Sequence, residues 1–448
     1  MHVLLIGSYF FPVRSVASIR WTRLIKYMVR DGLDVGVLTD RKNLRSKTNY
    51  SYLCGVESES VSDYVGRDRL FEFDLSFVSK LWNIESNRRQ AKRRGGRKAV
   101  GSGGTGASAP NWARALKRSE LVAKSAIRQY SRLADRYDVV ISTFDPLWPH
   151  MVARRFKELN PDLVWVADFR DPVYGAGRFE DPSSLAWAAE VTDSADAVTY
   201  VAEGGDGLLN LPEGRTTILS NGFDPDDMEG VERGGSDRFR VVYTGTLCDG
   251  EESRRDLVPI LQTIQSLVDD GLVNPQDVVF EYAGTTSELF EKQLRRVAPL
   301  SFDCRDLGYV SRQDALNLQG SASLLAIATW NTAGMQGVVT GKLWEYLMSG
   351  VPVIGTCTGE VPGSRMKEIL DETGGGIMLE ECNAAEDAVA AKEFVLAKYR
   401  EWKESGRTTT DTNWAYLSRY SHENLAKRVE EVVTRAAASR QVDKNNKL

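Results

Sequence analysis

The chain carries two series of short apolar runs, and a stretch with helical spacing follows most of them. The first series covers residues 3–6, 35–38, 139–141, 163–166, 197–201 and 217–219, and the second covers 239–243, 278–282, 323–327 and 353–354. Runs that are apolar throughout are typical of parallel strands buried on both faces. The alternation with helices therefore predicts an α/β fold of two doubly wound, Rossmann-like domains.

Turn residues and low-complexity segments indicate where these domains begin and end. The turn at Asn221-Gly222 closes the first series, and a polar, acidic, Gly-rich stretch follows it. We therefore predict an N-terminal, acceptor-side domain at 1–222 with a basic flexible insertion at about 86–111, a linker at 223–237, a C-terminal domain at 238–415, a closing C-terminal helix at 416–436 and a flexible tail at 437–448. Two such domains bind ligands in the central cleft that they face, at the carboxyl ends of their strands.

Cysteine usage and hydropathy exclude several classes of protein. The five Cys are scattered without Cys-x-x-Cys spacing, and three His are few for a metal site, so neither a disulfide framework nor a zinc site is expected. The apolar N-terminus is too short for a signal peptide and lacks a basic leader, and no apolar run approaches about 20 residues. These features predict a cytoplasmic protein without a transmembrane helix.

The net charge of −5 combines two very different parts. Ten cations and no acidic residue lie between Asn87 and Arg118, so this stretch carries +10 and the rest carries −15. A globally basic nucleic-acid binder is therefore not expected. The seven cations from Arg88 to Lys98, followed by an amphipathic stretch with Trp112, suit peripheral attachment to an anionic inner membrane face. A solvated insertion is the alternative.

The clearest candidate for a binding site lies at residues 340–354. Thr340 and Gly341 lead into a predicted helix beside Lys342, and backbone N–H groups at a helix start, together with an ammonium group, form an anion site. Glu345, one turn further on, can accept hydrogen bonds from a vicinal diol such as a ribose. The alternative is an ordinary helix with a solvated Lys and an exposed Glu.

Six segments together resemble one enzyme family. They are 9–12 with Ile19-Arg20, Asp168-Phe169-Arg170-Asp171-Pro172, 218–224 (ILSNGFD), 243–247 (YTGTL), 340–354 (TGKLWEYLMSGVPVI) and 420–424 (YSHEN). In this order they resemble the family-4 glycosyltransferases of GT-B fold, in a subgroup with D-x-R-D-P and T-G-K-L-x-E-Y-L motifs. The resemblance spans nearly the whole chain. It implies transfer of a sugar from a nucleotide-diphosphate-sugar donor to a hydroxyl of a glycan, lipid-linked or small-molecule acceptor, with retention of the anomeric configuration.

The resemblance also implies roles for individual residues at the donor site. Glu345 matches the second Glu of the family's Glu-x7-Glu motif, which holds the donor ribose, whereas Gly337 replaces the first Glu. Lys342 is placed to neutralise the diphosphate. The remaining donor-binding candidates are Gly341, Thr340, Gly245, Thr246, Arg254 and Arg255. For the Arg pair the alternative is a solvated helix start. No metal or other cofactor is expected, since helix N–H groups and these cations can stabilise a departing diphosphate.

A second group of candidates belongs to the acceptor side. The predicted catalytic residues are Asp171, Asp168 and Arg170, which follow a predicted buried strand and should reach the cleft. Either Asp would orient the acceptor hydroxyl, and Arg170 would fix it or pair with phosphate; an internal Asp–Arg pair that stiffens a loop is the alternative. On the acceptor-side loop, Ser15 lets substrate approach the backbone, and Arg14 and Arg20 are phosphate candidates or solvated Arg residues at a helix start.

Three other functions share parts of this pattern. A nucleotide-sugar epimerase of GT-B fold would use the same donor pocket. A non-catalytic nucleotide-sugar-binding or scaffold protein is suggested by Gly337 in place of the motif Glu. A dehydrogenase is disfavoured because no Gly-x-Gly-x-x-Gly follows the run at 3–6.

Overall fold

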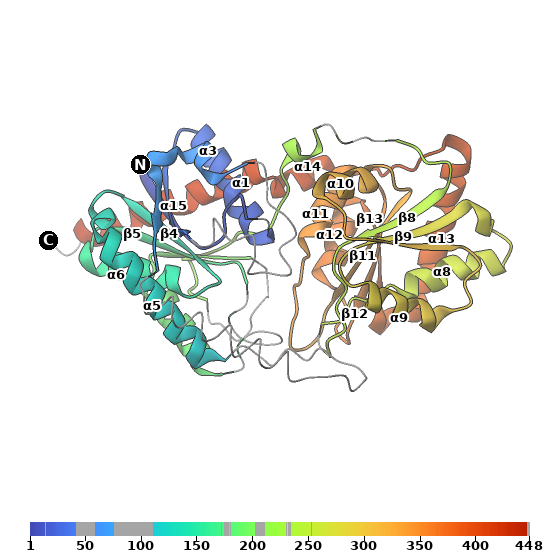
Figure 1. The fold of residues 1–448 in the computed structure, drawn as a ribbon, viewed down its shortest axis with the longest axis horizontal. Coiled ribbons are helices and arrows are strands. Elements are labelled where there is room, and N and C mark those ends of the chain that lie inside the picture. The colour runs from blue at the N-terminus through green and yellow to red at the C-terminus, as the bar shows by residue number, and fades with distance from the viewer. Residues whose placement is uncertain are drawn as a thin grey trace. The chain divides into compact units, whose positions relative to one another are not determined.

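The chain folds into two α/β units, each built around a parallel sheet. The computed structural model describes residues 1–13, 15–41, 59–75, 111–171, 173, 179, 181–201, 211–229, 231, 234–251 and 253–445. One unit consists of Met1–Ser220 with His422–Leu448, and the other consists of Asn221–Ser421 (Figure 1). The predicted pair of doubly wound domains is confirmed.

The first unit contains a seven-stranded parallel sheet in the order β3-β2-β1-β4-β5-β6-β7. The strands are β1 (His2–Ile6), β2 (Asp34–Asp40), β3 (Leu70–Phe73), β4 (Val139–Phe144), β5 (Val164–Phe169), β6 (Ala197–Tyr200) and β7 (Thr216–Ile218). One face packs against α5 (Trp112–Tyr130), α6 (Trp148–Leu159) and α7 (Ser183–Ser194), and the other against α1 (Val16–Arg30), α3 (Val61–Val65) and α15 (His422–Asn445).

Strand β1 shows why the strands are apolar throughout. Leu4 and Ile6 join the core cluster under α5, α6 and α7, whereas Val3 and Leu5 join the cluster under α1, α3 and α15. Successive side chains of a strand point to opposite faces, and here both faces are covered by helices.

The second unit contains a six-stranded parallel sheet in the order β10-β9-β8-β11-β12-β13. The strands are β8 (Phe239–Thr244), β9 (Val278–Ala283), β10 (Asp303–Gly308), β11 (Leu324–Trp330), β12 (Val353–Thr358) and β13 (Gly376–Glu380). Helices α8 (Val258–Asp269), α9 (Ser287–Val297) and α13 (Ala384–Ser405) cover one face, and α10 (Arg312–Gly320), α11 (Gly341–Ser349), α12 (Arg365–Thr373) and α14 (Trp414–Leu417) cover the other.

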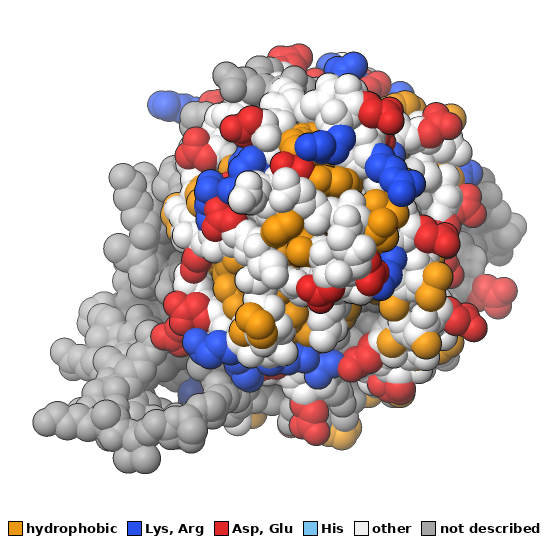
Figure 2. Space-filling view, turned by 90° about the vertical axis from the view of Figure 1, so that its right-hand side faces the viewer, with side chains coloured by type: hydrophobic (Ala, Val, Ile, Leu, Met, Phe, Trp, Pro, Cys, Tyr) orange, Lys and Arg blue, Asp and Glu red, His pale blue; other side chains and the backbone are white. Residues whose placement is uncertain are grey.

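The outer surface of this unit is mixed in charge. Figure 2 looks onto the side that lies on the right in Figure 1, and it shows acidic and basic side chains interspersed, with hydrophobic side chains between them. A surface of this kind suits solvent, and it agrees with the ordinary globular composition of the chain.

Several predicted boundaries change. The segment at 223–237 is not a free linker at its start, because Phe223 packs in the core under α10, α11 and α12 and Asp224 is fully buried. The predicted closing helix at 416–436 is divided: α14 belongs to the second unit, and α15 belongs to the first, where Leu425 and Val429 pack against the α1 side of the core. The predicted flexible tail is helical as far as Asn445.

Candidate functional site

Two of the predicted donor-site residues meet where β8 ends and α11 begins. Gly245 follows β8 with a φ of 145°, a conformation that favours glycine. A Cβ placed on Gly245 would lie 3.4 Å from Cε of Lys342. The Tyr346 hydroxyl accepts a hydrogen bond from the N–H of Thr244 at 2.9 Å and so fixes α11 against β8. The Lys342 stem therefore lies within van der Waals reach of the loop at Gly245.

The loop after β8 adds a second cation to this cluster. After β8 the loop turns back on itself, since the N–H of Arg255 donates to the carbonyl of Cys248 at 3.0 Å. The Arg255 guanidinium donates to the carbonyl of Thr246 at 2.7 Å and lies 5.5 Å from the ring centre of Trp330, at the end of β11. Arg255 is therefore held beside Gly245 by a hydrogen bond and a cation–π contact.

The start of α11 supplies backbone donors. Thr340 precedes the helix in an extended conformation, and its side chain makes no capping hydrogen bond. The Thr340 hydroxyl is buried and has no hydrogen-bond partner among the described residues. The first N–H groups of a helix have no intrahelical acceptor, and Gly341 occupies the first position. With Lys342 next to it, this helix start has the chemistry of an anion site.

Glu345 lies between two cations. Its Oε1 accepts from Nη1 of Arg312 at 2.8 Å, and its Oε2 lies 3.4 Å from Nζ of Lys342. Burial of the carboxyl group opposes ionisation, but the two cations outweigh it and lower the pKa of Glu345 to about 2. Glu345 is thus a permanent carboxylate, which can accept hydrogen bonds but cannot donate them.

Arg312 is a site residue that the sequence analysis missed. Its Nη2 donates to Oδ2 of Asp227 at 2.6 Å, so one guanidinium bridges Asp227 and Glu345. The one local signal is Ser311, which caps α10 by accepting from the N–H of Asp314 and so places Arg312 at the first position of that helix. Asp227 lay in the segment that was predicted to be linker.

Arg254 does not join this cluster. Its Nη2 donates to Oε1 of Glu381 at 2.6 Å, and its Nε lies 3.9 Å from Asp256. The carbonyl of Arg254 accepts from the Thr358 hydroxyl at the end of β12. Arg254 is therefore engaged with Glu381 and Asp256, whereas Arg255 contacts Thr246 and Trp330, and the predicted donor-site role of Arg254 stays a prediction.

In the first unit, Asp168 does not follow the strand as predicted but lies within β5, and it is fully buried. Oδ1 accepts from Arg20 at 2.9 Å and from Thr199 at 2.8 Å, and Oδ2 accepts from Trp21 at 2.9 Å and from Thr143 at 2.8 Å. Four donors satisfy the carboxylate. The prediction that Asp168 reaches a substrate is wrong for this conformation, and its role here is to hold four elements together.

Arg20 is also internal, which corrects the prediction that it contacts phosphate. The side chain is 2% exposed, and Nη1 donates to the carbonyls of Leu219 and Ser220 at 2.7 and 2.9 Å. Ser15 is the N-cap of α1 and accepts from the N–H of Ser18 at 3.1 Å. Arg14 lies outside the described residues.

Asp171 and Arg170 lie at the end of β5 and are paired with each other. Nη1 of Arg170 lies 2.7 Å from Oδ2 of Asp171, and Nη2 donates to the carbonyl of Asp145 at 2.8 Å. The guanidinium lies 5.3 Å from the ring centre of Tyr9. The Asp171 side chain is 26% exposed and is the most accessible of the three predicted catalytic residues.

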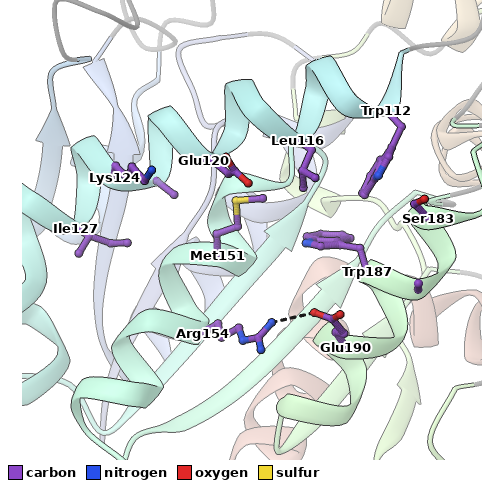
Figure 3. Close-up of a pocket in the computed structure, with 12 residues that line it drawn as sticks. Trp112, Leu116, Glu120, Lys124, Ile127, Met151, Arg154, Ser183, Trp187 and Glu190 are labelled. Carbon is purple, nitrogen blue, oxygen red and sulfur yellow. Dashed lines mark hydrogen bonds and ion pairs between the residues drawn. The ribbon is translucent and has the colours of Figure 1, made fainter.

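The first unit also carries a separate groove of about 600 Å³. Figure 3 shows it between α5, α6 and α7, with Trp112 and Trp187 toward one end and Lys124 and Ile127 toward the other. Arg154 and Glu190 pair across it at 3.2 Å. Several residues of the amphipathic stripe predicted after the basic stretch, Trp112 among them, therefore line a groove, and none of the predicted site residues does.

The described residues contain no group of three or more His, Cys, Asp or Glu side chains placed to hold a metal ion. None of the helices they form is long and apolar enough to cross a membrane.

Comparison with known proteins gives matches to solved structures. No known family profile and no curated protein matches the chain. One match is the catalytic domain of starch synthase IV from Arabidopsis thaliana, bound to ADP and acarbose, with a TM-score of 0.55 and 12% sequence identity. The alignment covers 98% of this chain and 99% of the starch synthase domain. The trehalose-6-phosphate protein from E. coli, bound with UDP-2-fluoro glucose, has a TM-score of 0.59 and 9% identity, and the alignment covers 96% of this chain and 99% of that protein. WaaG, a glycosyltransferase involved in lipopolysaccharide biosynthesis, has a TM-score of 0.50 and 12% identity, and the alignment covers 96% of this chain and 99% of WaaG.

These matches extend over nearly the whole of each chain and include both parallel-sheet units. The chain therefore has the two-domain, Rossmann-like GT-B fold, as predicted. At 9 to 12% identity the likeness concerns the fold, and membership of family 4 stays a prediction.

Proposed function

We propose that the chain is a glycosyltransferase that moves a sugar from a nucleotide-diphosphate-sugar donor to a hydroxyl group of an acceptor, with retention of the anomeric configuration. The observation that carries the proposal is the cluster of Gly245, Arg255, Lys342 and Glu345 at the carboxyl ends of strands in the second unit. The family-4 resemblance of the same segments and the nucleotide ligands of two GT-B neighbours support this class of donor.

The chemistry of the cluster suits a diphosphate leaving group. The first amides of α11, the Lys342 ammonium and the Arg255 guanidinium would stabilise the charge that develops as the sugar leaves. Because these groups supply positive charge, we propose that no divalent metal is needed. Glu345, ionised and facing Lys342, would accept hydrogen bonds from the ribose hydroxyls.

The acceptor belongs to the first unit in this proposal. Asp171, the most accessible of the predicted catalytic residues, would orient the acceptor hydroxyl, with Arg170 holding its carboxylate. A glycan, a lipid-linked molecule and a small molecule all offer such a hydroxyl. We further propose a cytoplasmic protein that uses Arg88–Lys98 to stay at an anionic membrane surface, since a lipid-linked acceptor would lie there.

A thermal-shift screen of nucleotide sugars, followed by a transfer assay, tests the proposal. A donor at about 100 times its Kd should stabilise the protein by about 2.7 kcal/mol. Lys342→Ala and Glu345→Ala should lose the shift and the transfer, whereas Arg400→Ala, which removes an exposed cation on α13, should keep both.

Three outcomes would contradict the proposal in different ways. Wild-type donor affinity and rate in both site variants would overturn the site. Donor binding without transfer to any acceptor would favour a binding or scaffold protein, which Gly337 already suggests. Turnover of the donor sugar without an acceptor would indicate an epimerase.

A further inference from the structure

The carboxylate of Glu345 has one tight partner and one loose partner. Arg312 is only 19% exposed and contacts Oε1 at 2.8 Å, whereas Lys342 is 38% exposed and lies 3.4 Å from Oε2. An Arg guanidinium is a planar fork that holds two acceptors in fixed directions, whereas a Lys ammonium is a point charge on a flexible stem. Arg312 is thus built to stay, and Lys342 is free to move without leaving Glu345 unpaired.

Arg312 is itself held from two sides. Its second nitrogen contacts Oδ2 of Asp227 at 2.6 Å, and the Asp227 side chain is only 8% exposed. Its backbone begins α10, which Ser311 caps. The four side chains Asp227, Arg312, Glu345 and Lys342 alternate in charge and sum to zero. Withdrawal of Lys342 would leave the other three still connected, with Oε2 of Glu345 open to a new donor.

We propose that Arg312, braced by Asp227, is a positioning residue that holds Glu345 ready for a ribose hydroxyl while Lys342 transfers from Glu345 to the diphosphate. This inference rests on the proposed function. The ligand-free site keeps its ribose-binding and phosphate-binding groups paired with each other. A nucleoside diphosphate separates them, since its phosphates take the ammonium and its ribose takes the freed carboxylate oxygen. Neither group is left without a partner in either state.

A purely structural role for Arg312 would give different results. In that case Arg312 would only tie α10 to α11, and its loss would weaken every nucleotide to the same degree. A positioning role acts through Glu345 and therefore affects ligands that carry the ribose hydroxyl more than ligands that lack it, for which only the release of Lys342 is impeded. Arg240 provides a matched control. Its guanidinium contacts Glu281 at 2.9 Å and Ser321 at the other end of α10, and its side chain is 18% exposed, close to the 19% of Arg312.

The experiment measures Kd by isothermal titration for UDP, ADP and their 2′-deoxy and 3′-deoxy counterparts, in the full-length protein. A hydrogen bond to a charged group contributes enough for the wild type to prefer at least one ribose form by about tenfold. Arg312→Gln should reduce that preference to less than about twofold, with a smaller loss of affinity for the deoxy forms than for the ribose forms. Arg240→Gln should keep the preference.

Two more variants keep the inference testable if Arg312→Gln does not fold. Asp227→Asn should weaken the preference in the same direction, and Arg312→Lys should restore it only in part, because an ammonium cannot bridge both carboxylates. A wild-type preference retained in well-folded Arg312→Gln, or an equal loss for ribose and deoxy forms, would overturn the inference alone. Failure of the wild type to bind any nucleoside diphosphate would overturn the proposed function and the inference together.

Discussion

At the scale of single residues, two carboxylates three positions apart have opposite surroundings. Asp168 is fully buried with four donors, whereas Asp171 is 26% exposed and pairs with Arg170. In the sequence both carboxylates follow an apolar run, and nothing local distinguishes them. The donors to Asp168 lie 25 to 148 residues away and come together only in the folded sheet.

Asp168→Asn should therefore act on stability. The amide group would face two donors with a donor of its own and would leave Arg20 buried without its ion pair, which typically costs about 3–5 kcal/mol. Urea denaturation of the full-length protein measures this. Asp171→Asn is the control, with an expected change below about 1 kcal/mol and, if Asp171 orients the acceptor, a loss of transfer. An Asp168→Asn variant as stable as the wild type would refute the structural role.

The ion pair between Glu345 and Lys342 predicts how the stability of the protein depends on pH. The pKa of Glu345 falls from an ordinary 4.5 to about 2, so its ionised form stabilises the fold above about pH 4.5, and this contribution is lost as pH falls toward 2. Lys342→Ala removes one of the two cations, so the folded-state pKa should rise toward 4.5, and the loss of stability on acidification should be smaller and complete at a higher pH than in the wild type. Melting temperatures between pH 2 and 7 measure the shift. Arg400→Ala, which removes an exposed cation on α13, should leave the curve unchanged, and coincident curves for the wild type and Lys342→Ala would contradict the pairing.

At the scale of elements, the interior strands were predicted, whereas three of the four edge strands, β3, β10 and β13, were not. The runs of β1, β4, β5, β8 and β9 are mostly apolar and buried, and each was predicted. Strand β10 lies at the edge of its sheet, has no fully buried residue and reads Asp-Cys-Arg-Asp-Leu-Gly, so nothing in its pattern indicates a strand. Edge strands with charged side chains are a general device against aggregation, and this device hides them from hydropathy.

Helix α15 shows how chain order can mislead. It follows the second unit in sequence, yet Leu425 and Val433 are fully buried in the α1 side of the first unit. Leu425→Ala should therefore destabilise the first unit by about 2–5 kcal/mol, through lost burial and a cavity. Glu431→Ala, at an exposed position of the same helix, is the control, with a change below about 0.5 kcal/mol. Denaturation followed by tryptophan fluorescence distinguishes them, and equal stabilities would show that α15 does not support that core.

At the scale of the whole molecule, the sequence located the part of the candidate site that is local. Lys342 and Glu345 stand three residues apart on one helix, so a single segment contained both. Arg312 lies 33 residues before Glu345, and Asp227 lies a further 85 residues before Arg312. Only the packing of α10, α11 and the segment after Asn221 brings the three side chains together. The separation of Arg254 from Arg255 likewise depends on Glu381, which is 127 residues from Arg254.

The charge distribution supports a last prediction. The segment Arg88–Lys98 lies outside the described residues, but α5, which follows it, exposes Arg114, Lys117 and Arg118. Near an anionic bilayer each cation contributes about 1 kcal/mol, so two fully engaged cations already account for more than tenfold in binding. We therefore expect the full-length protein to sediment with vesicles that contain phosphatidylglycerol, and less so at high salt.

Replacing all seven cations of the segment by Gln should reduce vesicle binding at least tenfold while leaving donor binding unchanged, because the donor site belongs to the second unit. Lys292→Gln with Arg295→Gln, two exposed cations on α9, is the matched control and should bind vesicles as the wild type does. Equal sedimentation of the wild type and the seven-cation variant would show that the segment is a solvated insertion. The +10 of this region would then have no part in bringing the protein to a membrane surface.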